Sequence, residues 1–99
     1  MYKIHIPRSA RRDIREAALW YNEQKPGLGK RFAHTVLRKI ELISEQPHLY
    51  EVRYDEIRMA LTPIFPFTIH FKVYEKRRVI AILGVFHTSR NPENWSKRQ

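Results

Sequence analysis

The sequence predicts an α+β fold in the order β-α-α-β-β-β, in which a helical hairpin packs on one face of a small, mainly antiparallel sheet. Two adjacent segments between residues 9 and 46 carry apolar residues at helical spacing. Three later segments are alternating or continuously apolar, as strands are. Because the chain has 99 residues, we expect one domain over residues 1–99, with residues 96–99 as a flexible tail.

The first part of the chain predicts a strand and a helix. Tyr2, Ile4 and Ile6 alternate with polar residues, which predicts a short strand that ends at Pro7. Ser9 is expected to cap the helix that follows. The apolar positions of this helix share one face: Ala10, Ile14, Ala17, Ala18 and Tyr21.

A turn and a second helix complete the predicted hairpin. The sequence KPGLG at residues 25–29 predicts the turn. Pro47 is expected to end the second helix, because proline lacks the amide hydrogen that an interior helical position donates. This helix has an apolar stripe with two more apolar residues beside it: Phe32, Val36, Ile40 and Ile43, with Ala33 and Leu37.

The second half of the chain predicts three strands joined as a meander. Apolar residues alternate in residues 57–61 and 67–73, and residues 79–86 are apolar without a break. The connections TPIFP and EKRR are too short for a crossover helix, so neighbouring strands are expected to be antiparallel. The helical hairpin should cover the face that carries Phe67, Ile69, Phe71 and Val73. The opposite face, beside Arg58, is the candidate working surface and carries Thr68, His70, Lys72 and Tyr74.

Charge narrows the classes of partner. The chain has 19 Lys and Arg against 10 Asp and Glu, which gives a formal net charge of +9. Such a charge attracts polyanions, which include DNA, RNA, an RNA-rich assembly and an acidic protein segment. The alternative is a solvated basic surface that only aids solubility.

Other features of the composition exclude several kinds of site. The absence of cysteine excludes disulfides, iron–sulfur clusters and thiolate zinc sites. No two histidines have metal-binding helical spacing, so we expect no metal and no cofactor. The longest apolar run, residues 79–86, is far shorter than the ~20 residues that cross a membrane, and the amino terminus lacks a secretory signal. We therefore expect a cytosolic protein without a membrane partner.

The polar stretch HTSRNPENW at residues 87–95 follows this apolar run, and it either closes the sheet or forms a site. A histidine at a strand end is more often a hydrogen-bonding residue than a catalyst, and this applies to His87. Arg90 is expected to tie the strand end to a carbonyl group or to an acidic residue of the first helix. Trp95 is expected to pack back on the body of the protein.

Several stretches, in this order, resemble the RelE/ParE superfamily of toxins from type II toxin–antitoxin modules. They are DIREAALWYNEQKPGLGKRF, ISEQPHLY, FPFTIHFKV and VFHTSRNPENW. The resemblance covers nearly the whole chain, and its most specific parts are the WYNEQ…PGLG…F stretch and the His-x-x-Arg-x-Pro-x-x-Trp ending. It implies the same β-α-α-β-β-β fold and a basic toxin that inhibits growth, serves plasmid stabilisation and is neutralised by a cognate antitoxin.

The resemblance implies one of two mechanisms. One branch of the superfamily cleaves messenger RNA on the ribosome, and His87, Arg58 and Arg90 would then supply proton transfer and charge stabilisation. The other branch binds DNA gyrase. Thr68 stands where the nuclease branch usually has an important Arg, and no Tyr follows Arg90. We therefore predict gyrase inhibition by binding, with the ribosome-dependent endonuclease as the alternative and a non-toxic, antitoxin-binding domain as a weaker one.

Two contact surfaces follow from this hypothesis, and neither involves a small-molecule substrate. An acidic, partly disordered antitoxin is expected to fold onto the apolar helical hairpin. The expected antitoxin contacts are Ile14, Ala18, Tyr21, Phe32 and Val36. The expected contacts with the target or with nucleic acid are Arg58, His70, Lys72, Tyr74 and His87.

Overall fold

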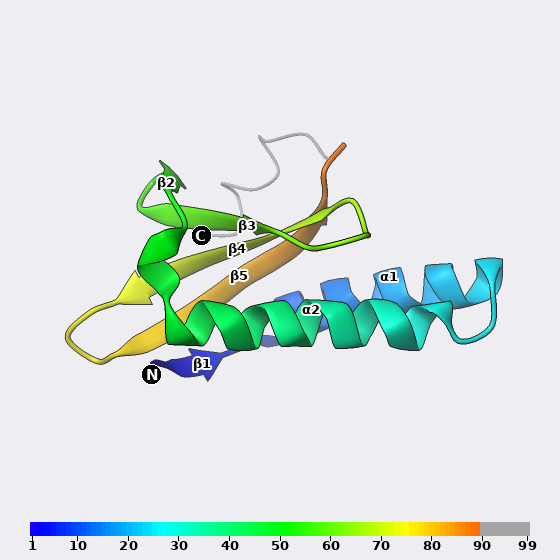
Figure 1. Ribbon diagram of the computed structural model, residues 1–99, viewed down its shortest axis with the longest axis horizontal. Coiled ribbons are helices and arrows are strands. Elements are labelled where there is room, and N and C mark those ends of the chain that lie inside the picture. Colours follow the sequence, from blue (N-terminus) through cyan, green and yellow to red (C-terminus); the bar gives the residue numbers. More distant parts are fainter. Residues whose placement is uncertain (90–99) are drawn as a thin grey trace.

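The structure, a computed structural model, describes residues 1–89 and contains two helices packed on one five-stranded sheet (Figure 1). The elements in chain order are β1 (Lys3–His5), α1 (Arg8–Gln24), α2 (Leu28–Glu45), the 3-10 helix η1 (Pro47–Leu49), β2 (Val52–Tyr54), β3 (Ile57–Leu61), β4 (Phe67–Tyr74) and β5 (Val79–His87). The strands lie in the order β1-β5-β4-β3-β2, and only the β1–β5 pair is parallel. The predicted α+β class and the meander of β3, β4 and β5 are confirmed, whereas the short edge strand β2 was not predicted.

The two helices run side by side across one face of the sheet, and the tip of the hairpin projects beyond the sheet (Figure 1). α1 begins directly after Pro7, and no side chain caps it. The expected cap at Ser9 is wrong, because Ser9 already lies inside the first turn. α2 ends at Glu45, before Pro47, as predicted. No helix within residues 1–89 has the length and apolarity that a membrane span requires.

The turn between the helices depends on two glycines with different roles. Gly27 has a φ of 90°, in the left-handed region that favours glycine, and its amide donates a hydrogen bond of 2.8 Å to the Asn22 side chain. Gly29 is buried at a point where α2 closely approaches the backbone of α1. An added Cβ atom at Gly29 would lie 2.1 Å from the carbonyl oxygen of Ala18. The predicted KPGLG turn is therefore also the point of contact between the helices.

The core lies between the helical hairpin and the facing side of the sheet. Four aromatic rings meet there at the hairpin end of β4, with ring centroids 4.9 to 6.2 Å apart: Tyr21, Phe32, Phe65 and Phe67. Further along, the core is aliphatic, with Val36, Ile40 and Ile43 of α2 buried against the sheet. The predicted inward face of β4 and the inward stripe of α2 are thus confirmed.

A β-bulge explains why residues 79–86 are apolar without a break. Phe71 pairs with Ile82 and His70 pairs with Gly84, so Leu83 is the extra residue in β5. The bulge shifts the alternation by one residue. As a result, Ile82 and Val85 both belong to the core that faces the helices, although they are separated by an odd number of positions.

The faces of β3 are the reverse of those predicted. Arg58 is paired with Phe71 and Ala60 with Ile69, so these residues lie on the side that the helices cover. The other alternate set of β3 residues, which includes Met59, pairs with the outward residues of β4. The expectation that Arg58 lies on the outer face is wrong, because the apolar set in β3 packs on the outer face and not on the helices.

Candidate functional site

The outer face of the sheet, expected to be a polar working surface, contains a buried hydrogen-bonding network around His70. The His70 side chain is 0% exposed and Thr68 is 6% exposed. The Tyr54 hydroxyl lies 2.8 Å from His70 Nδ1, and Thr68 Oγ1 lies 2.9 Å from His70 Nε2. The rings of Tyr54 and Phe86 make edge contacts with the His70 ring. The prediction that His70 contacts a target or nucleic acid is therefore wrong, because its side chain does not reach solvent.

The donor and acceptor roles of the hydrogen bonds in this network are mutually consistent. Thr68 Oγ1 donates to the carbonyl oxygen of Phe86 at 3.3 Å, so it accepts from His70 Nε2. His70 Nδ1 then accepts from the Tyr54 hydroxyl. Burial, with a smaller contribution from the carboxylate of Asp55, raises the pKa of Tyr54 to about 12. Thr68, which stands where the nuclease branch usually has Arg, has a structural role here.

The Tyr54 hydroxyl makes a testable contribution to stability at alkaline pH. Its pKa in the folded chain, about 12, is above the value of about 10 expected in the unfolded chain. This contribution is fully present below about pH 10 and is lost as the pH rises toward 12. We expect the stability of the parent protein to fall more steeply between these pH values than that of Tyr54→Phe, as measured by urea unfolding. Equal slopes would contradict this role of Tyr54.

Lys72 and Tyr74 form an accessible polar part of the outer face. The Lys72 ammonium lies 5.2 Å from the centroid of the Tyr74 ring and 3.7 Å from a carboxylate oxygen of Glu56. The Tyr74 side chain is 42% exposed. These two predicted contact residues are therefore adjacent and available to a partner.

Of the three residues predicted for RNA cleavage, Arg58 and His87 lie in the described part of the chain, and they are not adjacent. The Arg58 guanidinium donates to the carbonyl oxygen of Tyr50 at 2.6 Å, on the side of the sheet that the helices cover. Arg58 pairs with Phe71 and His87 pairs with Phe67, positions that are about 13 Å apart along β4 at ~3.3 Å per residue. Arg58 and the end of β5 therefore lie at different places on the sheet. The expected roles of Arg90, Trp95 and the tail at 96–99 fall outside the described residues.

His87 lies at the end of β5, on the side of the helices, and is held by local hydrogen bonds. Its Nδ1 accepts from the Ser89 backbone amide at 3.1 Å and lies 2.7 Å from the Ser89 hydroxyl. Because Nδ1 is an acceptor, the neutral ring carries its proton on Nε2. The ring packs edge-on against Phe67, with centroids 5.3 Å apart, and His87 is exposed. His87 therefore closes the strand and remains accessible.

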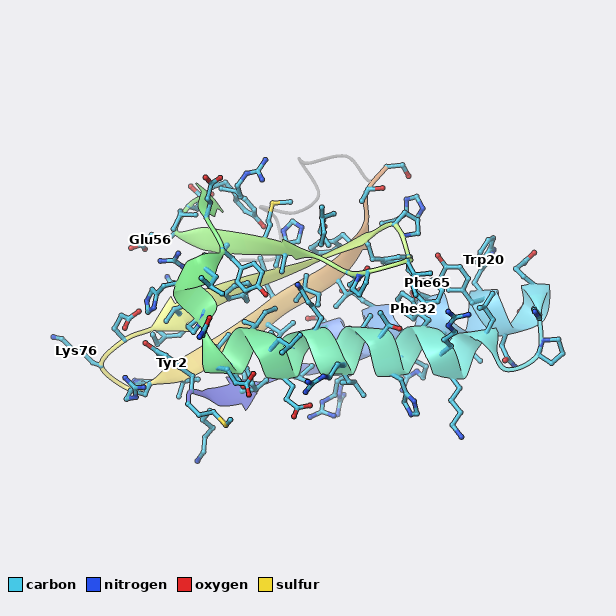
Figure 2. The ribbon with its side chains drawn as sticks, in the orientation of Figure 1. Tyr2, Trp20, Phe32, Glu56, Phe65 and Lys76 are labelled. Carbon is cyan, nitrogen blue, oxygen red and sulfur yellow. The ribbon has the colours of Figure 1, made fainter. Side chains whose placement is uncertain are left out.

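A groove beside His87 was not predicted from the sequence. It has a volume of about 530 Å³ and lies between α1 and the last part of β5; we call it the α1–β5 groove. Its lining is Asp13, Glu16, Ala17, Trp20, Tyr21, Pro66, Phe67, Val85 and His87. Figure 2 shows Trp20 near Phe32 and Phe65, at the end of the molecule opposite to Tyr2 and Lys76. The helical spacing of Asp13, Glu16 and Trp20 was the signal in the sequence that could have indicated this groove.

Asp13 joins the groove to the edge of the sheet. β1 pairs with β5 only as far as Ala81, so no strand from residues 1–89 pairs with the later part of β5 on that side. There the Val85 amide donates to the Asp13 carboxylate at 3.0 Å. α1 thus supplies a side-chain acceptor where no strand of residues 1–89 provides one, which keeps this edge from pairing with another chain.

Asp13→Ala should lower the free energy of unfolding by about 1–3 kcal/mol, because the Val85 amide loses a charged acceptor. Denaturant unfolding measures this change. Glu16→Ala is the control, since it removes a neighbouring exposed carboxylate, and it should change stability by less than about 0.5 kcal/mol. Equal effects of the two substitutions would show that the bond to Val85 contributes little.

Most residues of the predicted antitoxin surface are inside the protein. Phe32 and Val36 are 0% exposed and Ile14 is 9% exposed, because this apolar face packs on the sheet. The prediction is wrong for these three residues. Ala18 is half-buried, with its backbone carbonyl at the contact with Gly29, so its role in antitoxin binding stays a prediction. Tyr21 is half-buried and lines the α1–β5 groove, so it also remains a candidate contact.

No metal site is evident in the described range: residues 1–89 contain no group of three or more His, Asp or Glu side chains placed to bind a metal ion. At the end of the molecule away from the groove, hydrogen bonds with His48 and Tyr2 hold the pKa of Glu75 below its usual value. These contacts join β1 and η1 to the end of β4. They are structural and lie at the end of the molecule where Figure 2 labels Tyr2.

Comparison with known families and structures gives a consistent result. The sequence matches the family of the ParE toxin of the type II toxin–antitoxin system parDE over residues 4–92. The fold is similar to that of a chromosomal ParDE toxin–antitoxin system from P. aeruginosa, with a TM-score of 0.79, 16% identity and coverage of 90% of this chain and 98% of that chain. It is also similar to the intact E. coli RelBE toxin–antitoxin complex, with a TM-score of 0.69, 14% identity and coverage of 91% of this chain and 100% of that chain. No curated protein sequence matches the chain. At these identities, the solved structures establish a shared fold.

Proposed function

Because the chain belongs to the ParE toxin family of type II toxin–antitoxin systems, we propose that it inhibits growth by binding DNA gyrase and that an acidic antitoxin neutralises it. The family match and the two fold relatives place the chain among toxins of the ParE/RelE superfamily. Both relatives come from toxin–antitoxin systems, which supports an antitoxin partner here. The net charge of +9 supports an acidic one.

The observation that carries the choice of gyrase over messenger RNA is the charge around His87. Among residues 1–89, the lining of the α1–β5 groove beside His87 contains the carboxylates of Asp13 and Glu16 and no Lys or Arg. A carboxylate repels the phosphodiester that a nuclease must hold, and no cation from residues 1–89 lines the groove to stabilise a phosphorane. Arg58 is hydrogen-bonded to the Tyr50 carbonyl group and Thr68 to His70, so both side chains have structural partners. The described residues therefore support a toxin that acts by binding more than one that cleaves RNA.

Two parallel measurements test the proposal. The purified chain should block supercoiling by gyrase, and messenger RNA ends mapped after induced expression should show no new cleavage. Codon-phased cleavage with unaffected gyrase would establish the nuclease alternative, in which His87→Ala should slow cleavage by about 10²–10⁴-fold. Growth that is unaffected by induction would establish the non-toxic alternative.

Lys72 and Tyr74 are the residues that we assign to the contact with gyrase. Lys72→Glu should raise the concentration of toxin that inhibits supercoiling by about tenfold, equivalent to 1.4 kcal/mol, because it reverses a charge on an accessible part of the outer face. Lys76→Glu is the control, since it makes the same charge change in the exposed β4–β5 turn. Equal effects of the two variants would mean that only net charge matters.

A further inference from the structure

We propose that the α1–β5 groove receives an arginine side chain presented by the antitoxin, and that this occupant covers His87. The inference rests on the proposed function, because it names a contact of the proposed antitoxin. It follows from the aromatic wall of the groove, from its local charge and from the position of His87.

The aromatic wall is continuous from one end of the groove to the other. The ring centroids are 5.2 Å apart for Trp20 and Tyr21, 6.2 Å for Tyr21 and Phe67, and 5.3 Å for Phe67 and His87. Trp20, at the start of this series, is 57% exposed despite its size. A partly exposed tryptophan at the edge of an apolar groove is the kind of residue on which binding energy concentrates in protein interfaces.

The groove contains an exposed carboxylate, although the protein as a whole is basic. The chain carries +9, yet the lining that residues 1–89 provide includes Glu16 and no Lys or Arg. Glu16 is exposed and makes no ion pair with any residue in 1–89. An acidic occupant would be repelled by this carboxylate, and an uncharged apolar occupant would displace water from Glu16 without replacing its hydrogen bonds.

A guanidinium group meets both requirements of the groove. It stacks on the face of a tryptophan, and its planar donors match a carboxylate in two parallel hydrogen bonds. Its apolar stem packs against an apolar wall while the charged end stays near solvent, and Ala17 and Val85 provide such a wall here. Arginine on an otherwise acidic and apolar antitoxin segment therefore fits Trp20 and Glu16 together.

An occupant of the groove also covers the accessible residue at the end of β5. His87 lines the groove opposite α1, and within residues 1–89 its exposed ring makes a ring contact with Phe67 and hydrogen bonds with Ser89. A segment anchored between Trp20 and Glu16 would lie over this ring. Binding of the antitoxin and contact of His87 with a target would then exclude each other.

The test uses the full chain, labelled with 15N, and three blocked nonapeptides that differ only in a central Arg, norleucine or Glu. The Arg peptide should bind about three- to tenfold more tightly than the norleucine peptide, with NMR shifts at Trp20, Val85 and His87. Glu16→Gln should bring the two affinities within twofold of each other. Glu23→Gln, the control, removes an exposed carboxylate of α1 that does not line the groove and should leave the preference intact.

Three results would overturn the inference. They are equal affinity for the norleucine peptide, tighter binding of the Glu peptide, and absence of shifts in the groove with all three. Trp20→Leu provides a second variant, which should weaken binding of the Arg peptide more than that of the norleucine peptide. Loss of the arginine preference while gyrase is still inhibited contradicts only this inference, whereas a preserved preference with unaffected gyrase contradicts only the proposed target.

Discussion

Gly29→Ala should lower the free energy of unfolding by about 3 kcal/mol, although alanine is the better helix former by about 1 kcal/mol. The added Cβ atom would lie 2.1 Å from the carbonyl oxygen of Ala18 and 2.9 Å from its carbon. Both are backbone atoms inside α1, so no side-chain rotation relieves the clash and the helices must move apart. Chemical denaturation followed by circular dichroism measures this loss, which also lowers the melting temperature by more than 10 °C at about 4–8 °C per kcal/mol.

Two neighbouring positions provide controls for Gly29. Lys30→Ala changes the next, exposed residue of α2 and should alter stability by less than about 0.5 kcal/mol. Gly27→Ala adds a methyl group where no atom lies within 4 Å, so its cost comes only from the left-handed φ of 90° and should be about 1–2 kcal/mol. If Gly29→Ala costs no more than Gly27→Ala, the helices are not held at the distance that the structure shows.

His70→Ala should lower the free energy of unfolding by about 3–5 kcal/mol, because it leaves a cavity and removes a partner from two hydroxyl groups. The ring is 0% exposed and lies between Tyr54 and Phe86. Thr68→Val should cost about 1–3 kcal/mol by removing the hydroxyl that His70 contacts. The double variant should cost less than the two single changes together, because Thr68 and His70 act through the same bond.

Gyrase inhibition distinguishes this structural role of His70 from a role in binding. His70→Gln keeps hydrogen-bonding groups in place of the ring, and where the protein remains folded it should inhibit supercoiling as the parent does. A His70 variant that melts like the parent but no longer inhibits gyrase would return this residue to the contact surface.

Local signals in the sequence were sufficient for most of the fold. The alternation in β4, the helical stripe of Phe32 and Val36, and the stop at Pro47 each depend on neighbours in the chain, and each prediction is confirmed. The orientation of β3 and the bulge at Leu83 depend on pairing between strands. When both faces of a sheet are partly buried, the apolar spacing within one strand cannot show on which face its apolar residues lie. For this reason Arg58 was predicted on the wrong face.

The candidate site was less predictable because it is built from contacts between distant segments. The apolar face of the hairpin was predicted to form the core and also to bind the antitoxin. Packing on the sheet buries Phe32 and Val36 of this face completely, so they are not available to a partner. The polar residues on the outer face of β4 were expected to be exposed. The hydroxyl group of Tyr54, on the unpredicted strand β2, instead forms a hydrogen bond with the buried His70 ring. The α1–β5 groove lies between Trp20 of α1 and His87 of β5, and the helical spacing in α1 indicates one wall of it but not which strand provides the other.

The parallel pairing of β1 with β5 has a consequence for the order in which the chain folds during its synthesis. The contacts of the helical hairpin are local, whereas Asp13 and Val85 are 72 residues apart in the chain. The hairpin can therefore form early, but the sheet is incomplete until β5 has left the ribosome. At about 5–20 residues per second, the interval from the end of α2 to the end of β5 lasts several seconds. The wall of the groove that carries His87 is absent during that interval, so a partner already present in the cell meets the toxin as this surface forms. Synonymous codons that slow translation of residues 50–78 would lengthen the interval without changing the protein.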